Sequence, residues 1–173
     1  MVSVRIRFGC AFSAPPKVFV TTCGEQDLSD TFATSLYSVS ATESVVHIRR
    51  VDSPGSFLSE AKTDWGQVLK LNWYAVPADG AVDCGSVPVT ARQGAHLDSI
   101  CIPFGRAFAN PRVFLSVRGT GGVFDDVFAL SLRSVKATEC CVNLQRVDQD
   151  TAWGQPLEID WHAVVSPAAS LPL

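Results

Sequence analysis

Six cysteines and three histidines are the residues of this 173-residue chain that most often carry chemistry in proteins. The cysteines are Cys10, Cys23, Cys84, Cys101, Cys140 and Cys141. Their spacing is irregular and no CxxC pair occurs, so the spacing typical of a structural zinc site is missing. We expect buried, reduced thiols in preference to a disulfide framework, because a free cysteine packs like a small apolar residue. No metal site and no cofactor are predicted.

Asp160 and His162 are two positions apart in a strand-like stretch, so their side chains face the same side. With a serine they could form a catalytic triad, in which histidine activates the serine hydroxyl as a nucleophile. The chain contains no GxSxG segment that would hold such a serine on a sharp turn. We therefore expect no catalytic residues and no enzyme activity.

The four tryptophans form two pairs with different sequence surroundings. Trp73 and Trp161 end the alternating segments Leu69–Trp73 and Leu157–Trp161, which predicts that both lie in a core. Trp65 and Trp153 precede these segments, and each is followed by Gly-Gln. An exposed indole at either place could stack on the apolar face of a sugar ring, and packing across a sheet edge is the alternative role.

An internal repeat sets the organisation of the chain. Residues 30–52 match residues 126–148 at an offset of 96, with 14 identities in 23 positions. Residues 65–76 match residues 153–164 at an offset of 88, so the first copy carries eight extra residues near residues 53–63. We expect two tandem domains, residues 1–77 and 78–173.

Composition and periodicity indicate short strands separated by turns. Valine occurs 22 times, and Gly and Pro together supply 22 residues. Segments such as residues 18–20, 46–48, 113–117 and 142–144 are strand-like, and no segment keeps a helical period. The net charge of −3 does not favour nucleic-acid binding, and no apolar run is long enough for membrane insertion. The fold class predicted is all-β, with an antiparallel β-sandwich in each half.

The ordered motifs Phe-x-x-Pro-Pro-x-Val, Leu-Tyr-Ser-Val-Ser, Thr-x-Trp-Gly and Leu-x-Leu-x-Trp-x-Ala of the first copy resemble the H-type lectin domain, and the second copy repeats their order and spacing with substitutions. The resemblance covers residues 4–76 and 81–165. It implies two tandem antiparallel β-sandwiches of the six-stranded type, trimeric or pseudo-trimeric association, and binding of galactose-type sugars between subunits. Gly80–Gly85 resembles the opening strand of the family, followed by a loop at Ser86–Leu97. The first copy has no equivalent segment, which leaves an edge for its twin or a partner to cover.

The resemblance also identifies candidate sugar-binding residues. Trp65 and Trp153 match the family's Thr-x-Trp tryptophan. In the family, an arginine two residues before the Tyr-Ser-Val segment donates hydrogen bonds to the sugar, and Ser35 and Ser131 stand there in this chain. Serine lacks the charge and the planar set of donors of arginine. The sequence therefore predicts degenerate sugar sites.

Two functions are compatible with these observations. The first is a non-catalytic, H-type-lectin-like interaction module that joins other protein subunits in a larger intracellular assembly, such as a cytoskeletal, ciliary or flagellar one. The second is a lectin for N-acetylgalactosamine or galactose-type glycans in recognition or adhesion, with Trp65, Trp153, Tyr74 and His162 at its sites. No signal peptide precedes the first strand-like segment, which predicts a cytoplasmic protein; removal of a leader would make it extracellular.

Overall fold

The computed structural model describes residues 1–24, 31–51, 68–78, 83–90, 97–120, 126–147 and 156–165, and these residues form strands, turns and no helix. The first repeat copy supplies β1 (Val2–Arg7), β2 (Lys17–Gly24), β3 (Phe32–Val39), β4 (Glu43–Arg50) and β5 (Leu69–Val76). The second supplies β6 (Cys84–Val89), β7 (Leu97–Pro103), β8 (Pro111–Gly119), β9 (Phe128–Val135), β10 (Glu139–Arg146) and β11 (Leu157–Val165). The predicted all-β class is confirmed. Within the described residues, no helix has the length and apolar character needed to cross a membrane.

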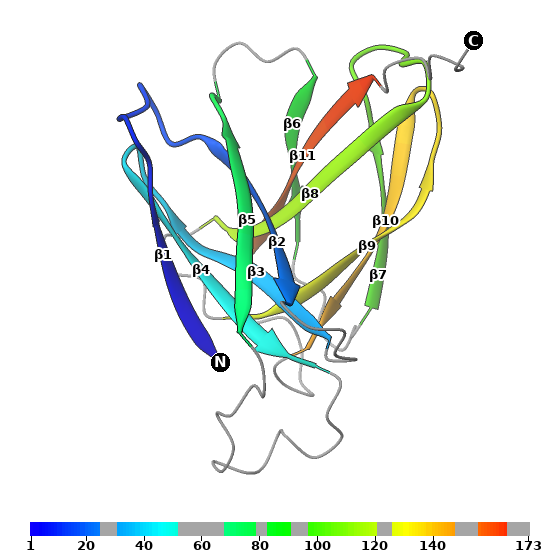
Figure 1. Cartoon of the computed structure of the whole chain (residues 1–173). Helices are drawn as coiled ribbons and strands as arrows, with labels where there is room; N and C mark the ends of the chain where they lie inside the picture. Colours follow the sequence, from blue (N-terminus) through cyan, green and yellow to red (C-terminus); the bar gives the residue numbers. More distant parts are fainter. Residues whose placement is uncertain are drawn as a thin grey trace, which may run out of the picture.

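The strands form three sheets, and the largest one contains strands of both copies (Figure 1). Its order is β1-β4-β3-β8-β11-β6, while β7-β10-β9 and β2-β5 form the two smaller sheets. The three-stranded sheet lies on the side of the molecule away from β1 (Figure 1). All strand pairs are antiparallel except β3 and β8, which are parallel and pair at Leu36 and Arg118.

Equivalent strands of the two copies pair in the same way. The order β1-β4-β3 of the first copy corresponds to β7-β10-β9 of the second, and β2-β5 corresponds to β8-β11. The pairs β3–β4 and β9–β10 each have a register shift at equivalent places, beside Tyr37 and beside Arg133. One strand has no counterpart: β6 pairs with β11, whereas β5 of the first copy pairs only with β2 among the described residues.

Buried apolar side chains gather in two clusters, and each cluster comes from one repeat copy. Alternation along the strands directs these side chains to one face, where their burial supplies the main stabilising free energy. The cluster of the second copy contains Val89, Ile102, Phe104, Phe108, Val117, Phe128, Cys140, Val142, Leu144, Leu157, Ile159, Trp161 and Ala163. That of the first copy contains Ile6, Val18, Leu36, Val46 and Ile48.

The expectation for the cysteines is wrong in part. Cys101 and Cys141 lie opposite each other on β7 and β10 and form a disulfide, with their Cα atoms 4.0 Å apart. Cys10 and Cys23 are exposed, and only Cys140 is a fully buried thiol. The sequence pattern could not show this, because pairing of two cysteines depends on the register of strands that are 40 residues apart.

Two further expectations about the strands need correction. The opening strand expected at Gly80–Gly85 is β6, which spans Cys84–Val89, so residues 86–89 are strand and not loop; residues 80–82 lie outside the described residues. Trp161 is buried, at 7% exposed, but its counterpart Trp73 is 42% exposed. The difference follows from the missing strand, because β6 covers Trp161 and no described strand takes the equivalent place beside Trp73.

Candidate functional site

The two repeat copies meet along β3 and β8, and hydrogen bonds to the backbone connect them there. The backbone N–H of Phe128 donates to Oγ of Ser35 over 3.1 Å, and Ser116 Oγ donates to the carbonyl oxygen of Val18 over 2.7 Å. Ser35 and Ser116 are both buried. A buried hydroxyl needs such a partner, because an unmatched polar group costs about 1–3 kcal/mol. We call this contact region between the copies the junction.

A cluster of charged side chains lies beside this strand pair. Asp160 of β11 is fully buried, and its carboxylate accepts hydrogen bonds from Ser86 Oγ at 2.5 Å and Arg118 Nε at 2.9 Å. Lys17 of the first copy donates to Ser86 Oγ over 2.6 Å and lies 3.4 Å from Asp160 Oδ1. Arg118 also pairs with Glu158. The buried carboxylate therefore faces two cations, one from each copy, which balances its charge inside the protein.

Aromatic side chains form the other part of the junction. Tyr74 of β5 stacks on Phe19 with ring centroids 5.0 Å apart, and meets Phe114 edge-on at 5.3 Å. The Tyr74 hydroxyl lies 3.3 Å from Nδ1 of His162, so a hydrogen bond crosses between the copies. Stacked and edge-on aromatic pairs each contribute about 0.5–1.5 kcal/mol beyond the area they bury.

Burial in this region shifts the pKa of several groups. Burial raises the pKa of the Tyr74 hydroxyl above its ordinary value, and the nearby Cys84 raises it further. Burial lowers the pKa of His162, while the charge of Asp83 partly opposes that shift. The pKa of the Cys84 thiol is raised by burial, with Lys17 acting in the opposite direction and Asp160 and Asp83 adding to the rise. The lowered pKa of His162 favours the neutral imidazole, whose Nδ1 donates to or accepts from the Tyr74 hydroxyl according to its tautomer.

A cavity of about 370 Å³ opens at the edge of the junction. Tyr37 and Lys17 of the first copy and Arg118, Thr120 and Asp160 of the second are among its lining residues. Its volume falls within the range of small-ligand sites, about 300–1,000 Å³, and its lining offers both cationic donors and an acceptor. Such a lining could hold a small polar molecule by hydrogen bonds.

The predicted sugar-site residues are dispersed. Ser35 is buried in the junction, whereas Ser131 is exposed on β9. Trp65 and Trp153 lie outside the described residues. The two serines have repeat-equivalent positions but opposite environments. A sugar contact by any of the four stays a prediction.

Sequence reasoning missed the residues that join the copies. Asp160 was considered only beside His162, but its carboxylate contacts Ser86, Lys17 and Arg118 instead. One signal could have indicated Asp160: its repeat counterpart is the neutral Asn72, in segments that are otherwise closely similar. No group of three or more potential metal ligands occurs in the part of the chain that the structure describes. Comparisons with protein-family models, with curated proteins and with solved structures found no match for this chain.

Proposed function

We propose that this chain is a non-catalytic interaction module, made of two tandem H-type-lectin-like sandwiches, that joins protein subunits into a larger assembly. The separate buried clusters of the two copies support the division into two domains. The ordered motifs of the repeat support the family resemblance. Disulfides such as Cys101–Cys141 form chiefly in oxidising compartments, so this bond does not favour the predicted cytoplasmic location, and the proposal names no compartment.

The observation that carries this proposal is the different exposure of two equivalent strands. In β3, Ser35 is 1% exposed and accepts a hydrogen bond from the Phe128 N–H of the second copy, while Leu36 is fully buried in the apolar cluster of the first copy. In β9, the counterpart Leu132 is 42% exposed, and every residue from Ser131 to Val135 is exposed. The edge of β3 pairs with β8, whereas the equivalent edge of β9 pairs with no other described strand, so β9 presents the strand edge through which the first copy meets the second.

The junction is also directional, because it uses different surfaces of the two copies. The strand pairing that joins the copies uses β3 of the first copy and β8 of the second, whose first-copy counterpart is β2. On β2, Thr21 is exposed, while its counterpart Ser116 is buried in the junction. An association that joins unlike surfaces can repeat until a ring closes. We infer that β9 of one chain binds β2 of another.

A crosslinking experiment tests this arrangement at a single pair of positions. Leu36 pairs with Arg118 in the junction, and the repeat counterparts of these residues are Leu132 and Cys23. Cys23 is exposed. In the Leu132→Cys variant, mild oxidation should therefore form a disulfide between chains, since directly paired strand positions bring cysteines within bonding distance. The crosslinked peptides are identified by mass spectrometry.

Two controls make the crosslink specific. Leu132→Cys combined with Cys23→Ser should not crosslink, and Val165→Cys tests an equally exposed apolar position at the end of β11. Sedimentation of the unmodified chain should also show species heavier than one chain. The Leu132→Asp variant should contain a smaller share of these species. A chain that sediments as a monomer at all concentrations, without a crosslink to Cys23, contradicts the proposal.

The alternative is a lectin for galactose-type glycans, and the cavity at the junction is the observation that favours it. The cavity lies between the copies and has lysine, arginine, tyrosine and threonine side chains that could donate to sugar hydroxyls. Titration calorimetry with N-acetylgalactosamine tests this function. Saturable binding that is lost in Tyr37→Ala or Trp153→Ala would favour the lectin, and absence of heat at millimolar sugar would reject it.

A further inference from the structure

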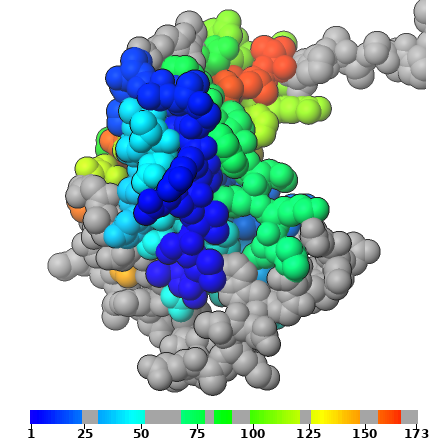
Figure 2. Space-filling view, turned by 60° about the vertical axis from the view of Figure 1, so that its left-hand side comes forward, coloured from blue at the N-terminus to red at the C-terminus, as the bar shows by residue number. Residues whose placement is uncertain are grey.

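The outer edge of β5 in the first copy lacks, within the described residues, the neighbouring strand that the second copy has at the equivalent place. In the second copy β11 has β8 on one side and β6 on the other, whereas β5 pairs with β2 alone among the described residues. Figure 2 turns the side of β1 forward and shows β1 in dark blue and β5 in green at this part of the surface. A strand with one unpaired edge is a template for another extended segment.

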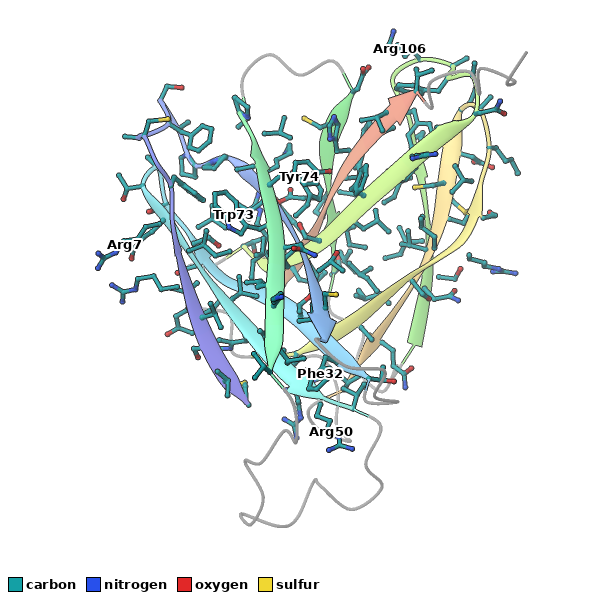
Figure 3. All side chains as sticks on the ribbon, in the orientation of Figure 1. Arg7, Phe32, Arg50, Trp73, Tyr74 and Arg106 are labelled. Atoms are coloured by element: carbon teal, nitrogen blue, oxygen red, sulfur yellow. A yellow bond between two sulfur atoms is a disulfide. The ribbon has the colours of Figure 1, made fainter. Side chains whose placement is uncertain are left out.

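Equivalent side chains of β5 and β11 differ in exposure where β11 has β6 beside it. Leu157, Ile159 and Trp161 of β11 are buried, and the first two are fully buried. Their counterparts Leu69 and Leu71 are only partly buried, and Trp73 is 42% exposed. In Figure 3, Trp73 lies on the side of β5 that faces β1, and its indole contacts Phe8 at a centroid distance of 5.7 Å. The first copy thus exposes apolar surface where the second copy has β6.

The contacts of β6 with β11 define what the missing strand must contain. Gly85 lies opposite Trp161, and a Cβ atom built on Gly85 would come within 2.6 Å of the indole. A strand beside Trp161 therefore requires glycine at that position, because any larger residue would push the indole out of place. Val87 and Val89 lie opposite Ile159 and Leu157, so apolar residues follow at alternate positions.

We propose that β5 binds an extended segment of a partner protein by strand addition. The segment runs antiparallel to β5 with a glycine opposite Trp73, a small polar residue opposite Asn72 and apolar residues opposite Leu71 and Leu69. Backbone hydrogen bonds of this kind give affinity, and the side chains at alternate positions give specificity. This inference does not depend on β9 or on the association proposed above.

One feature distinguishes the partner segment from β6 itself. Asp83, just before β6, is held by a two-pronged hydrogen bond from Arg106, at 2.8 and 2.7 Å. The repeat counterpart of Arg106 is Cys10, whose side chain lacks the paired N–H donors with which a guanidinium holds a carboxylate. A partner of β5 therefore needs the glycine but not the aspartate.

The probe is a synthetic peptide with the sequence of residues 83–90, carrying Cys84→Ser to prevent disulfide exchange. Hydrogen–deuterium exchange of the full chain should show saturable protection of the amides of β5 as the peptide is added. A peptide with Gly85→Val should bind at least about tenfold more weakly, since its side chain would overlap the indole. A peptide with Asp83→Asn should protect β5 as well as the parent peptide does.

Two variants of the chain distinguish peptide binding at β5 from association through β9. Trp73→Ala, with folding checked by circular dichroism, should lose protection of β5, whereas Leu132→Asp should keep it. That second variant also separates failure of this inference from failure of the assembly proposed through β9. The inference is overturned if millimolar peptide leaves β5 unprotected, or if the Gly85→Val peptide binds equally well. It is also overturned if β5 is covered by β6 of a second copy without any peptide.

Discussion

Nζ of Lys17 lies 3.4 Å from Oδ1 of Asp160, although 143 positions separate the two residues in the sequence. The lysine belongs to the first repeat copy and the aspartate to the second, so this ion pair fixes the copies relative to each other. Both side chains are largely or fully buried. Arg118 and Ser86 complete the hydrogen bonding of the carboxylate, which leaves it with partners on both oxygens.

Replacing Asp160 by asparagine should therefore destabilise the whole chain. The variant leaves the buried ammonium of Lys17 without its counter-charge, and losing one partner of a buried pair costs about 3–5 kcal/mol. Chemical denaturation measures the free energy of unfolding. The control is Glu139→Gln, which removes an ion pair with the exposed Lys136 and should cost less than about 1 kcal/mol. Equal effects of the two variants would contradict the structural role of Asp160.

Ser35→Ala and Ser131→Ala change equivalent positions of the repeat and should have different effects. Ser35→Ala removes the acceptor of the Phe128 N–H, which is buried, and should cost about 1–3 kcal/mol. Ser131→Ala alters an exposed side chain on β9 and should change stability by less than about 0.5 kcal/mol. Thermal and urea unfolding measure the loss of stability in each variant. Similar losses in the two variants would show that Ser35 does not join the copies.

Trp161→Ala should destabilise the chain more than Trp73→Ala. Trp161 packs at 5.3 Å from Phe104 and against Gly85, and removal of a buried indole costs about 3–5 kcal/mol. Trp73 is half exposed, so its removal should cost about 1–2 kcal/mol. The two tryptophans also differ in solvent contact, and acrylamide should quench Trp73 but not Trp161. Equal costs and equal quenching would argue that β5 is covered.

His162 should make stability depend on pH. Burial lowers its pKa below the ordinary value of 6.5, so the unfolded chain takes up a proton at a higher pH than the folded chain. The contribution of His162 to the free energy of unfolding should therefore be constant above about pH 7 and should fall as the pH decreases through 6.5. The melting temperature of the His162→Gln variant should fall less steeply over the same pH range than that of the unmodified chain. Parallel curves for the two proteins would contradict the lowered pKa.

The cysteines should differ sharply in their reaction with iodoacetamide. Burial raises the pKa of Cys140 to about 11, which at pH 8 lowers its thiolate fraction at least about a hundredfold below that of an ordinary cysteine. Cys10 and Cys23 are exposed and should be modified first. Cys101 and Cys141 should react only after reduction, because they form a disulfide. Peptide mass spectrometry follows each site, and rapid alkylation of Cys140 would show that its strand is not packed as described.

Local pattern and the repeat predict most of the strands. Alternation of apolar and polar residues indicated β5 and β11, and the offset of 96 matches β3–β4 to β9–β10 without any shift of their bounds. These features depend on neighbouring residues, whose side chains alternate between faces in any strand. The all-β class follows from the same evidence.

The junction could not be predicted in this way, because equivalent residues have different environments. Leu36 and Leu132 stand at equivalent positions of the repeat, each directly after a serine, yet one is buried and the other exposed. The difference arises from contacts between residues far apart in sequence, as does the exposure of Trp73 and the pairing of Cys101 with Cys141. A periodic pattern shows which face of a strand is apolar and not what covers it.

Hydrogen–deuterium exchange of β9 as a function of protein concentration tests the central claim most directly. If β9 of one chain binds β2 of another, the amides of residues 128–135 should become protected as concentration rises. The amides of residues 32–39 in β3 serve as an internal reference, because the second copy of the same chain already covers that strand. Exchange in β9 that stays rapid and independent of concentration, while β3 stays protected, would contradict the association.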